Sequence, residues 1–499
     1  MRSLLFALLL LPLAIFSKPI RYEITPLLRD GSLRLQVRVW FEGDANGTTR
    51  LTVPTRFGSA EHLFRSIQHF ACTTPGSQLR FDADSAFVTV AHAPKQALKL
   101  YYEVAQDFPG ENISDDHIYR PILQPSYFHI LGRALFIAPL WDVGYDVTLE
   151  WHHFPVEWAL HNSFGTGARS QQFSFSNLRW LESVFVGGDY RTMKTEVHGQ
   201  DVWLAIRGRD WSFDDDALLT MLRQIVEVQR DFWQDFDLPF YTVTLTPLAP
   251  LPITASGPIY EWSRAAYFGV AVINSFTAFA TPFKSQSERD LCYLFHHELM
   301  HNWIGWQIRC GTGPSDMRMA WFSEGFTEYF ALRNMLKGEF ITPDKYMEEL
   351  NRRFFGGLYR SPKREASNCA VADSFFKCPH LERLPYLRGC VFAFFLDNAI
   401  KAKSTGKAGL HDLMLDFLEY YQRPDKNLSR HFDFFIETCS DYLLQDVEPH
   451  FEKFIQEGKM IPADAFVLPP YFKMEVDDDG APFFWLDKDV AGWEEGLKQ

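Results

Sequence analysis

The spacing of hydrophobic residues changes once along this chain, near Trp211, and this change limits the architectures that the sequence can adopt. From about Lys18 to Arg209, apolar and polar residues alternate, as in Leu33–Phe41 (LRLQVRVWF). A period of two is typical of half-buried β-strands. Beyond the change, Asp214–Phe236 has the apolar spacing of an amphipathic helix and an acidic first turn. The sequence therefore predicts a β-rich part followed by a part that contains helices.

Further patterns subdivide the helical part. Two strand-like segments, Tyr241–Leu245 and Ala266–Ile273, precede a mainly helical stretch that continues to about residue 457. Ser285-Gln-Ser-Glu288 fits a capping box and predicts a helix that runs to about Trp306. The other predicted helices are Ala320–Leu336, Pro343–Phe355, Leu384–Ala402, Leu410–Tyr421 and His431–Leu444.

The length of the chain predicts several domains. At roughly 150 residues per domain, 499 residues correspond to about two to four domains. We expect a multidomain α+β protein with an N-terminal β-sandwich or saddle domain. The predicted parts are a leader at 1–17, the β-rich domain at 18–209, a central domain of strands and helices at 210–345, a helical C-terminal region at 346–460 and a tail at 461–499.

The first residues have the pattern of an export signal. Arg2 supplies a positive charge, and the apolar stretch Leu4–Phe16 is too short to span a bilayer comfortably but fits a signal-peptide core. Cleavage is expected near Ser17, although Ile15 departs from the small-residue pattern. No later segment has the length and apolar character of a membrane helix. We therefore expect an exported protein, periplasmic or secreted, with no stable membrane span after the signal is removed.

Charge and cysteine spacing argue against two classes of function. The chain has 49 Lys and Arg against 63 Asp and Glu, a net charge of −14, so we expect no nucleic-acid partner. Its 7 Cys include no CxxC pair, which argues against a thiolate metal site. Cys369 and Cys378 flank a short polar stretch and are candidates for a disulfide bond, although sequence alone does not fix the pairing.

The segment Phe295–Trp303 contains the pattern HExxH, formed by His297, Glu298 and His301. Residues four apart lie on one face of a helix, so both imidazoles can bind one metal ion. Glu298 can then approach a metal-bound water as a general base. A pair of buried core histidines is the alternative, and the helical context favours the metal site. His296 points about 100° away from His297 around the helix, and we expect it to be structural.

A third ligand is expected from a neighbouring helix. Trp321–Phe330 (WFSEGFTEYF) predicts a helix with Glu324 in its first turn, 23 positions after His301. Two His and one Glu leave an open coordination position, the pattern of catalytic rather than structural zinc sites. Glu328, one turn later, is either an outer partner of the site or a solvated acid, and Glu324 is the favoured ligand.

These motifs resemble a known group of enzymes. HELMHNW followed by WFSEGFTEYF is similar to the gluzincin metallopeptidases, most closely the glycyl aminopeptidase family and more distantly the aminopeptidase N family. The resemblance covers most of residues 20–460 and implies a thermolysin-like zinc catalytic domain at 210–345. It also implies one Zn²⁺ held by His297, His301 and Glu324, and a peptide or protein substrate.

A second segment agrees with these families. Leu384–Gly389 (LPYLRG) resembles the PYxKG-like segment whose Tyr stabilises the tetrahedral intermediate, which implies this role for Tyr386. A phenol aimed at the developing oxyanion lowers the barrier without adding a charge. A Tyr that packs at the start of a helix is the alternative interpretation.

One segment departs from these families, in which a Glu on the strand before the zinc helix binds the substrate amine. The matching segment, Gly269–Ser275 (GVAVINS), has Ala271 at that place, and Glu261 is a candidate substitute whose spacing is wrong by one. The candidate substrate-binding residues are therefore Gly269, Ala271 and Glu261. The residues after 460 are too short for the PDZ domain that often ends the family, and no PDZ domain is evident in the tail.

The combined prediction is an exported zinc-dependent metallopeptidase that hydrolyses peptide bonds by a metal-activated water. Glu298 is the predicted base, and Tyr386 is predicted to support the oxyanion. The resemblance favours aminopeptidase-like action. Because of Ala271, a zinc endopeptidase with altered specificity is one alternative, and a non-catalytic binding protein on a peptidase scaffold is another.

Overall fold

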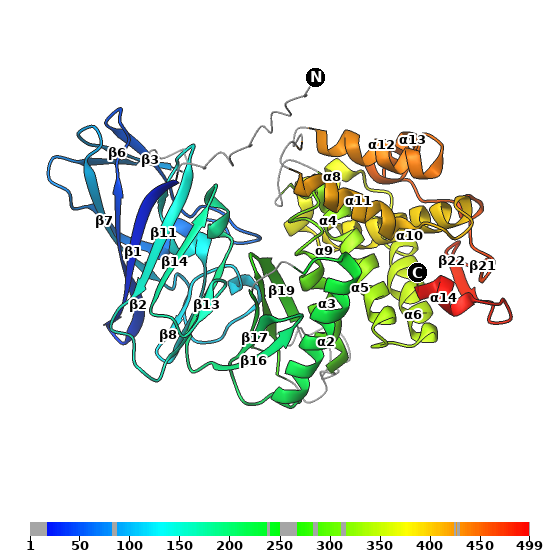
Figure 1. The fold of residues 1–499 in the computed structure, drawn as a ribbon, viewed down its shortest axis with the longest axis horizontal. Coiled ribbons are helices and arrows are strands. Elements are labelled where there is room, and N and C mark those ends of the chain that lie inside the picture. Colours follow the sequence, from blue (N-terminus) through cyan, green and yellow to red (C-terminus); the bar gives the residue numbers. More distant parts are fainter. Residues whose placement is uncertain are drawn as a thin grey trace, which may run out of the picture. The chain divides into compact units, whose positions relative to one another are not determined.

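The computed structural model describes residues 17–81, 87–236, 240–249, 267–282, 288–310, 316–423, 426 and 430–498. The chain divides into two compact units, Met1–Thr192 with Ala205–Gly208, and Met193–Leu204 with Arg209–Gln499. The first unit is β-rich, and the second contains a sheet and most of the helices (Figure 1). The predicted multidomain α+β class is thus confirmed. Residues 1–16 of the predicted leader lie outside the described residues.

Three sheets form the first unit. The 6-stranded sheet has the order β14-β11-β1-β2-β7-β4, with the bounds Ser170–Phe175, Gly144–Trp151, Ser17–Arg29, Ser32–Glu42, Ala97–Ala105 and Ile67–Cys72. The 4-stranded sheet has the order β10-β3-β6-β5, with the bounds Ala138–Pro139, Thr48–Thr52, Phe87–Ala91 and Gln78–Phe81. The 5-stranded sheet has the order β13-β12-β15-β9-β8, with the bounds Gly165–Thr166, Ala159–Asn162, Val184–Gly188, Tyr127–Leu131 and Ile122–Gln124. A single cluster of buried apolar residues connects these sheets.

The alternation in Leu33–Phe41 is the burial pattern of β2. Every second residue of this strand, from Leu33 to Phe41, is buried in that cluster, and the residues between them are partly exposed. Burial of one face of a strand is the physical source of a period of two. The short helix α1, Gly132–Leu135, is also buried among these sheets.

The second unit contains a 5-stranded sheet with the order β16-β17-β18-β20-β19. Its strands are Arg191–Val197, Gln200–Ile206, Phe240–Pro247, Ser275–Ala280 and Tyr267–Val272. β16 and β17 lie before residue 209, where the sequence predicts the β-rich domain to end, and most of this hairpin belongs to the second unit, which continues from Arg209. Alternation of apolar and polar residues identifies a strand but does not show which sheet the strand joins. Here β17 pairs with β18, which follows it in the chain only after the helix α2 (Asp215–Trp233).

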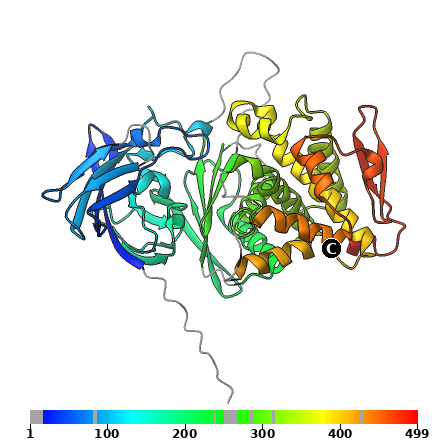
Figure 2. The same cartoon turned by 90° about the horizontal axis from the view of Figure 1, so that it is seen from above.

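Helices cover one face of this sheet in both Figure 1 and Figure 2. The helices α2 (Asp215–Trp233) and α3 (Glu288–Met300) pack against each other, and α3 also packs against β19 and β20. The side chain of Asp214 caps α2, because it accepts hydrogen bonds from the backbone N–H groups of Asp216 and Ala217. The predicted capping box at 285–287 lies outside the described residues.

The remaining predicted helices are present with similar bounds. They include a π-helical segment, Leu350–Phe355, that continues α6. The helices are α4 (Ala320–Ser323), α5 (Gly325–Lys337), α6 (Pro343–Glu349), α7 (Gly356–Tyr359), α8 (Asn368–Ser374), α9 (Pro379–Glu382), α10 (Leu384–Lys403), α11 (Leu410–Gln422), α12 (His431–Leu443) and α13 (Glu448–Phe451). The predicted helix Ala320–Leu336 is divided at Glu324, and the short helices α7, α8, α9 and α13 were not predicted.

Two glycines allow the helices of the site to approach closely. A Cβ atom on Gly325 would lie 2.3 Å from the Cα atom of Gly389, and one on Gly389 would lie 1.8 Å from the carbonyl oxygen of Trp321. No side chain fits at such separations. The backbones of α4 and α5 therefore contact α10 directly, which brings the predicted ligand Glu324 near the start of the helix that carries Tyr386.

A buried polar cluster fixes the other end of this contact. Asp397 of α10 accepts hydrogen bonds from the Tyr329 hydroxyl of α5 at 2.5 Å and from the backbone N–H of Leu410 at 2.7 Å. Arg333 donates to the same carboxylate, and the Lys401 ammonium lies 3.2 Å from it. Burial acts to raise the pKa of Asp397, but the charges of Lys401 and Arg333 outweigh it and hold the pKa well below its usual range.

The predicted tail forms a β-hairpin and a helix. Strands β21 (Phe472–Val476) and β22 (Pro482–Leu486) pair in antiparallel fashion, and α14 spans Trp493–Lys498. The amide of Asn351 donates to the backbone carbonyl of Phe484 at 2.7 Å and accepts from its N–H at 2.8 Å. The hairpin is thereby attached to the π-helical segment.

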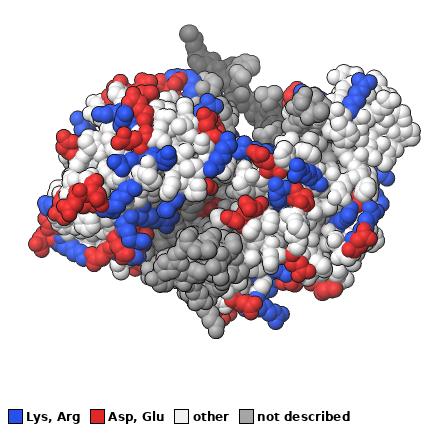
Figure 3. Space-filling view, turned by 180° about the vertical axis from the view of Figure 1, so that it is seen from behind, with Lys and Arg blue, Asp and Glu red and all other residues white. Residues whose placement is uncertain are grey.

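Three observations bear on the other expectations from the sequence. All seven cysteines have free thiols in the structure, so the disulfide considered between Cys369 and Cys378 is not formed. Among the described helices, none has both the length and the apolar character needed to cross a bilayer. Acidic and basic side chains are interspersed on the face shown in Figure 3.

Candidate metal centre

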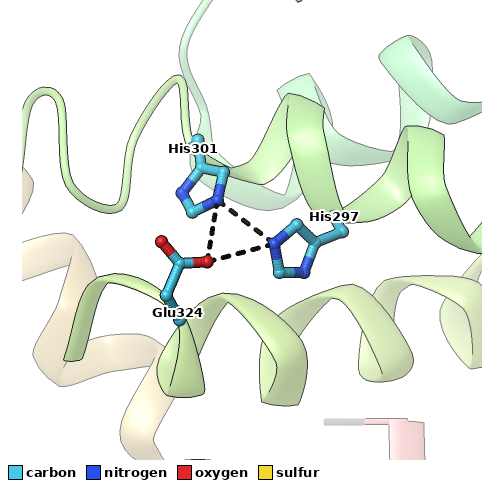
Figure 4. A group of neighbouring side chains, drawn as sticks. All are labelled: His297, His301 and Glu324. Atoms are coloured by element: carbon cyan, nitrogen blue, oxygen red, sulfur yellow. Dashed lines mark hydrogen bonds and ion pairs between the residues drawn. The ribbon is translucent and has the colours of Figure 1, made fainter. Parts of the chain in front are cut away.

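Three side chains from two neighbouring parts of the second unit converge on one point (Figure 4). The Nε2 atoms of His297 and His301 are 3.2 Å apart. The Oε2 atom of Glu324 lies 3.3 Å from Nε2 of His297 and 3.4 Å from Nε2 of His301. These are the residues that the sequence predicts as metal ligands, and the structure brings all three together.

The local backbone explains this convergence. His297 lies in the last turn of α3, and His301 follows directly after its final residue, Met300. Glu324 is the residue at the junction of α4 and α5. Because α3 packs against α5, the junction faces the end of α3. The helix predicted to reach about Trp306 therefore ends earlier, at the second candidate ligand.

The triangle of ligand atoms fits a tetrahedral zinc ion. Bonds of about 2.0–2.1 Å in tetrahedral geometry place ligand atoms about 3.3–3.4 Å from one another. The three observed separations, 3.2, 3.3 and 3.4 Å, agree with this value. Two imidazoles and one carboxylate occupy three corners and leave the fourth for a water molecule or a substrate.

The charges of the cluster also favour a bound cation. Burial acts to raise the pKa of Glu324, but the imidazoles of His301 and His297 outweigh it and hold the pKa well below its usual range. Burial lowers the pKa of His297 to about 4. Burial acts in the same direction on His301, but there the carboxylate of Glu324 outweighs it and raises the pKa to about 9. The carboxylate of Glu324, which is partly buried, is thus stabilised by positive charge at this point, and a metal ion can supply that charge.

Each imidazole has a partner behind it. Nδ1 of His301 donates to the backbone carbonyl of Ile304 at 3.2 Å, and the Thr327 hydroxyl lies 3.4 Å from the same nitrogen. Nδ1 of His297 lies 3.7 Å from Oε2 of Glu328. Partners of this kind select the tautomer that presents Nε2 to a metal. Sequence spacing had indicated only Glu328 among these partners.

Glu328 is not a solvated acid, the alternative that the sequence left open. Its side chain is buried, with 4% of the residue exposed. Its Oε1 atom accepts a hydrogen bond from the Arg353 guanidinium at 3.3 Å, and Arg353 stacks over the ring of Tyr293. Arg353 lies in the π-helical segment, and no sequence pattern had indicated its role.

The predicted base lies between the ligands and strand β19. Glu298 is 6% exposed, and burial raises the pKa of its carboxyl to about 7. The backbone N–H of Ala271 donates to this carboxyl group. A Cβ atom on Gly269 would lie 2.2 Å from Cδ of Glu298, so only glycine fits there. Two of the three predicted substrate-binding residues therefore contact Glu298, and the third, Glu261, lies outside the described residues.

Of two other residues considered in the sequence analysis, Tyr386 lies beside a candidate ligand and His296 does not. The ring of Tyr386, in the first turn of α10, is stacked with the ring of His297 at a centroid distance of 6.1 Å. His296 points away from the site, as the helix geometry indicates. It is fully buried, and the Gln229 amide donates to its backbone carbonyl at 2.8 Å.

A second group of possible ligands lies in the first unit. Glu23, Glu150 and His152 are also close together. Arg21 already donates to Glu23 at 2.6 Å and to Glu150 at 2.7 Å. The guanidinium occupies the place of a cation, and this group is a surface ion-pair network.

Comparison with known proteins agrees with the predicted class. Residues 290–377 match the family model of the M61 glycyl aminopeptidases, and this segment contains all three candidate ligands. A crystal structure of an aminopeptidase N family protein from Idiomarina loihiensis superposes with a TM-score of 0.69 and 16% sequence identity, over 92% of this chain and 80% of that chain. No curated protein sequence matches this chain.

The family match confirms the resemblance to the glycyl aminopeptidases over residues 290–377. At 16% identity, the structural match shows a shared fold. The fold is therefore like that of the aminopeptidase N family protein, and residues 290–377 match the model of a peptidase family.

Proposed function

We propose that this chain is a zinc-dependent metallopeptidase that hydrolyses peptide bonds. The observation that carries the proposal is the triangle of His297, His301 and Glu324, whose edges fit one tetrahedral ion, with the buried carboxyl of Glu298 beside it. The match of residues 290–377 to a peptidase family supports the same reaction. Export to the periplasm or the exterior is part of the proposal, on the basis of the leader-like segment Leu4–Phe16.

His297, His301 and Glu324 would hold the ion. When bound in an open site, zinc supplies a Lewis acid and lowers the pKa of a coordinated water. Glu298 then takes the proton of the attacking water and passes it to the leaving amine. A buried carboxyl with a pKa of about 7 is suited to both steps, because it loses and regains a proton near neutral pH.

Two further parts of the site would act on the substrate. The Tyr386 phenol, beside His297, would donate a hydrogen bond to the oxyanion that develops at the scissile carbonyl. β19 is one of the two edge strands of the described 5-stranded sheet, and its residues Gly269 and Ala271 border Glu298. An extended peptide can pair with such an edge through its backbone, independently of its side chains.

Metal analysis together with peptide digestion tests the proposal. We expect purified protein to contain about one zinc ion per chain, and a peptide library digested with it to show cleavage products by mass spectrometry. A chelator should abolish the cleavage, and added zinc should restore it. Bound zinc without any cleavage would contradict the peptidase proposal and favour the binding protein on a peptidase scaffold.

The position of Ala271 makes the choice between exopeptidase and endopeptidase testable. An alanine at this position offers no carboxylate to a substrate amine. The family match favours an aminopeptidase, whereas Ala271 favours an endopeptidase with altered specificity.

One peptide in two forms, with a free and with an acetylated N-terminus, distinguishes the two activities. If the enzyme is an aminopeptidase, we expect acetylation of the N-terminus to abolish cleavage, because the site must recognise the free amine. A group other than the side chain of Ala271 would provide that recognition. Equal kcat/KM values for the two forms would contradict aminopeptidase action and leave the endopeptidase alternative.

A further inference from the structure

The chain after α3 folds into a compact turn, residues 301–308, that begins with the candidate ligand His301. The carbonyl of Met300 accepts hydrogen bonds from the N–H groups of Trp303 at 3.1 Å and Ile304 at 3.0 Å. The carbonyl of Trp303 in turn accepts from Gln307 at 3.1 Å and Ile308 at 2.8 Å. We refer to residues 301–308 as the post-helix turn. Its backbone hydrogen bonds place Trp303 at its centre.

The post-helix turn controls the orientation of His301. Its Ile304 carbonyl accepts the hydrogen bond from Nδ1 of His301, so the position of this carbonyl sets the plane and tautomer of the imidazole. Gly305 follows with φ of +93°, a left-handed conformation that favours glycine. A displacement of the turn would therefore rotate Nε2 of His301 away from the other two ligands.

One carboxylate outside the turn holds it at two points. Oδ2 of Asp235 accepts a hydrogen bond from Nε1 of Trp303 at 2.8 Å and another from Nε2 of Gln307 at 3.2 Å. Asp235 lies two residues after the last residue of α2, Trp233, and its N–H donates to the carbonyl of Arg230 at 3.2 Å. The turn after α3 is thereby fixed to the end of α2.

Packing alone does not require these hydrogen bonds. Trp303 is 0% exposed and stacks on Trp233 at a centroid distance of 5.7 Å, so its ring is already buried among apolar neighbours. An apolar aromatic ring would satisfy that packing. The indole N–H adds a directed, charge-assisted hydrogen bond to Asp235. Packing buries the ring, and this hydrogen bond fixes the position of the turn.

We propose that Asp235, acting through Trp303 and Gln307, is a positioning residue that orients His301 toward the metal ion. The inference rests on the proposed function, because it assumes that His301 binds zinc. It concerns the contacts behind the ligand, and it predicts an effect on metal affinity that is separate from the chemistry of peptide hydrolysis.

The test measures metal binding in full-length variants. Asp235→Ala removes the acceptor, Asp235→Asn retains one carbonyl oxygen, and Trp303→Phe removes the indole N–H. Asp231→Ala is the matched control, because Asp231 lies on α2 and pairs with His198 at 2.9 Å through a carboxylate that is 53% exposed. The measurements are the zinc dissociation constant, by competition with a chelator, the visible spectrum of the cobalt-loaded protein and the melting temperature of the metal-free protein.

We expect Asp235→Ala and Trp303→Phe to raise the dissociation constant by roughly 10-fold, the lower end of the effect of losing a direct partner of a ligand, because both residues act on His301 through the Ile304 carbonyl. Both variants should also change the cobalt spectrum. Asp235→Asn should recover most of the affinity, and Asp231→Ala should bind zinc as the wild type does. An unchanged zinc affinity in Asp235→Ala, with or without a lower melting temperature, would overturn the inference while leaving the proposed function intact. A wild-type protein that binds no zinc would overturn both.

Discussion

Replacement of Glu298 by Gln is expected to lower kcat by roughly 10²–10⁴-fold, the contribution that a positioned general base makes. The glutamine side chain would retain the shape of the glutamate and an oxygen for the Ala271 N–H, but it cannot accept the proton of the attacking water. Glu298 does not belong to the triangle of ligand atoms, so zinc content should remain that of the wild type. Steady-state kinetics and metal analysis of the same preparation provide the measurement.

A matched variant separates the loss of the base from the loss of a negative charge. Glu339→Gln makes the same chemical change at a side chain that is 79% exposed and lies 3.2 Å from the Lys498 ammonium. Its kcat should equal that of the wild type. Turnover that persists in Glu298→Gln would contradict the assignment of Glu298 as the base.

Replacement of His301 by Ala is expected to have the second large effect, on metal binding itself. The substitution removes one of three ligand atoms and leaves the Glu324 carboxylate with a single imidazole. The zinc affinity should fall by more than the roughly 10–100-fold that follows from loss of a partner behind a ligand, and activity should fall with it. Chelator competition measures the affinity.

His296 provides the control from the same helix. It is fully buried and lies against Gln229 and Phe340, away from the ligands. His296→Ala should lower the melting temperature, because it leaves a cavity, and still bind zinc with nearly wild-type affinity. Full zinc occupancy in His301→Ala would refute the role of His301 as a ligand.

Local spacing was sufficient to nominate the residues of the site. The HExxH pattern placed His297 and His301 one helical turn apart, and the next apolar helix supplied Glu324. Such inferences succeed because the period of a helix fixes which side chains share a face. The same reasoning separated His296, one position away, from the cluster.

Spacing did not indicate the partners behind the ligands. The Ile304 carbonyl is a backbone group that any residue would carry, and Arg353 reaches Glu328 from a π-helical segment 25 positions away. Neither contact requires a particular type of residue at a fixed spacing from the ligands, so a sequence pattern cannot reveal it. The sequence predicted a helix to about Trp306, but α3 ends at Met300. Tertiary contacts explain this difference as well, because the hydrogen bonds of the post-helix turn and the hydrogen bond from Trp303 to Asp235 take the place of another helical turn.

The sequence by itself determined the change from a β-rich to a helix-containing part, the alternation that buries one face of β2 and the choice of candidate ligands, since each depends on chemistry repeated at short intervals. The tertiary structure alone decided that β16 and β17 join the 5-stranded sheet of the second unit, that Gly325 and Gly389 let α5 contact α10, and that Gly269 and Ala271 border Glu298. These features depend on which distant surfaces fit together. Shape complementarity between segments far apart in the chain is not encoded in any local period.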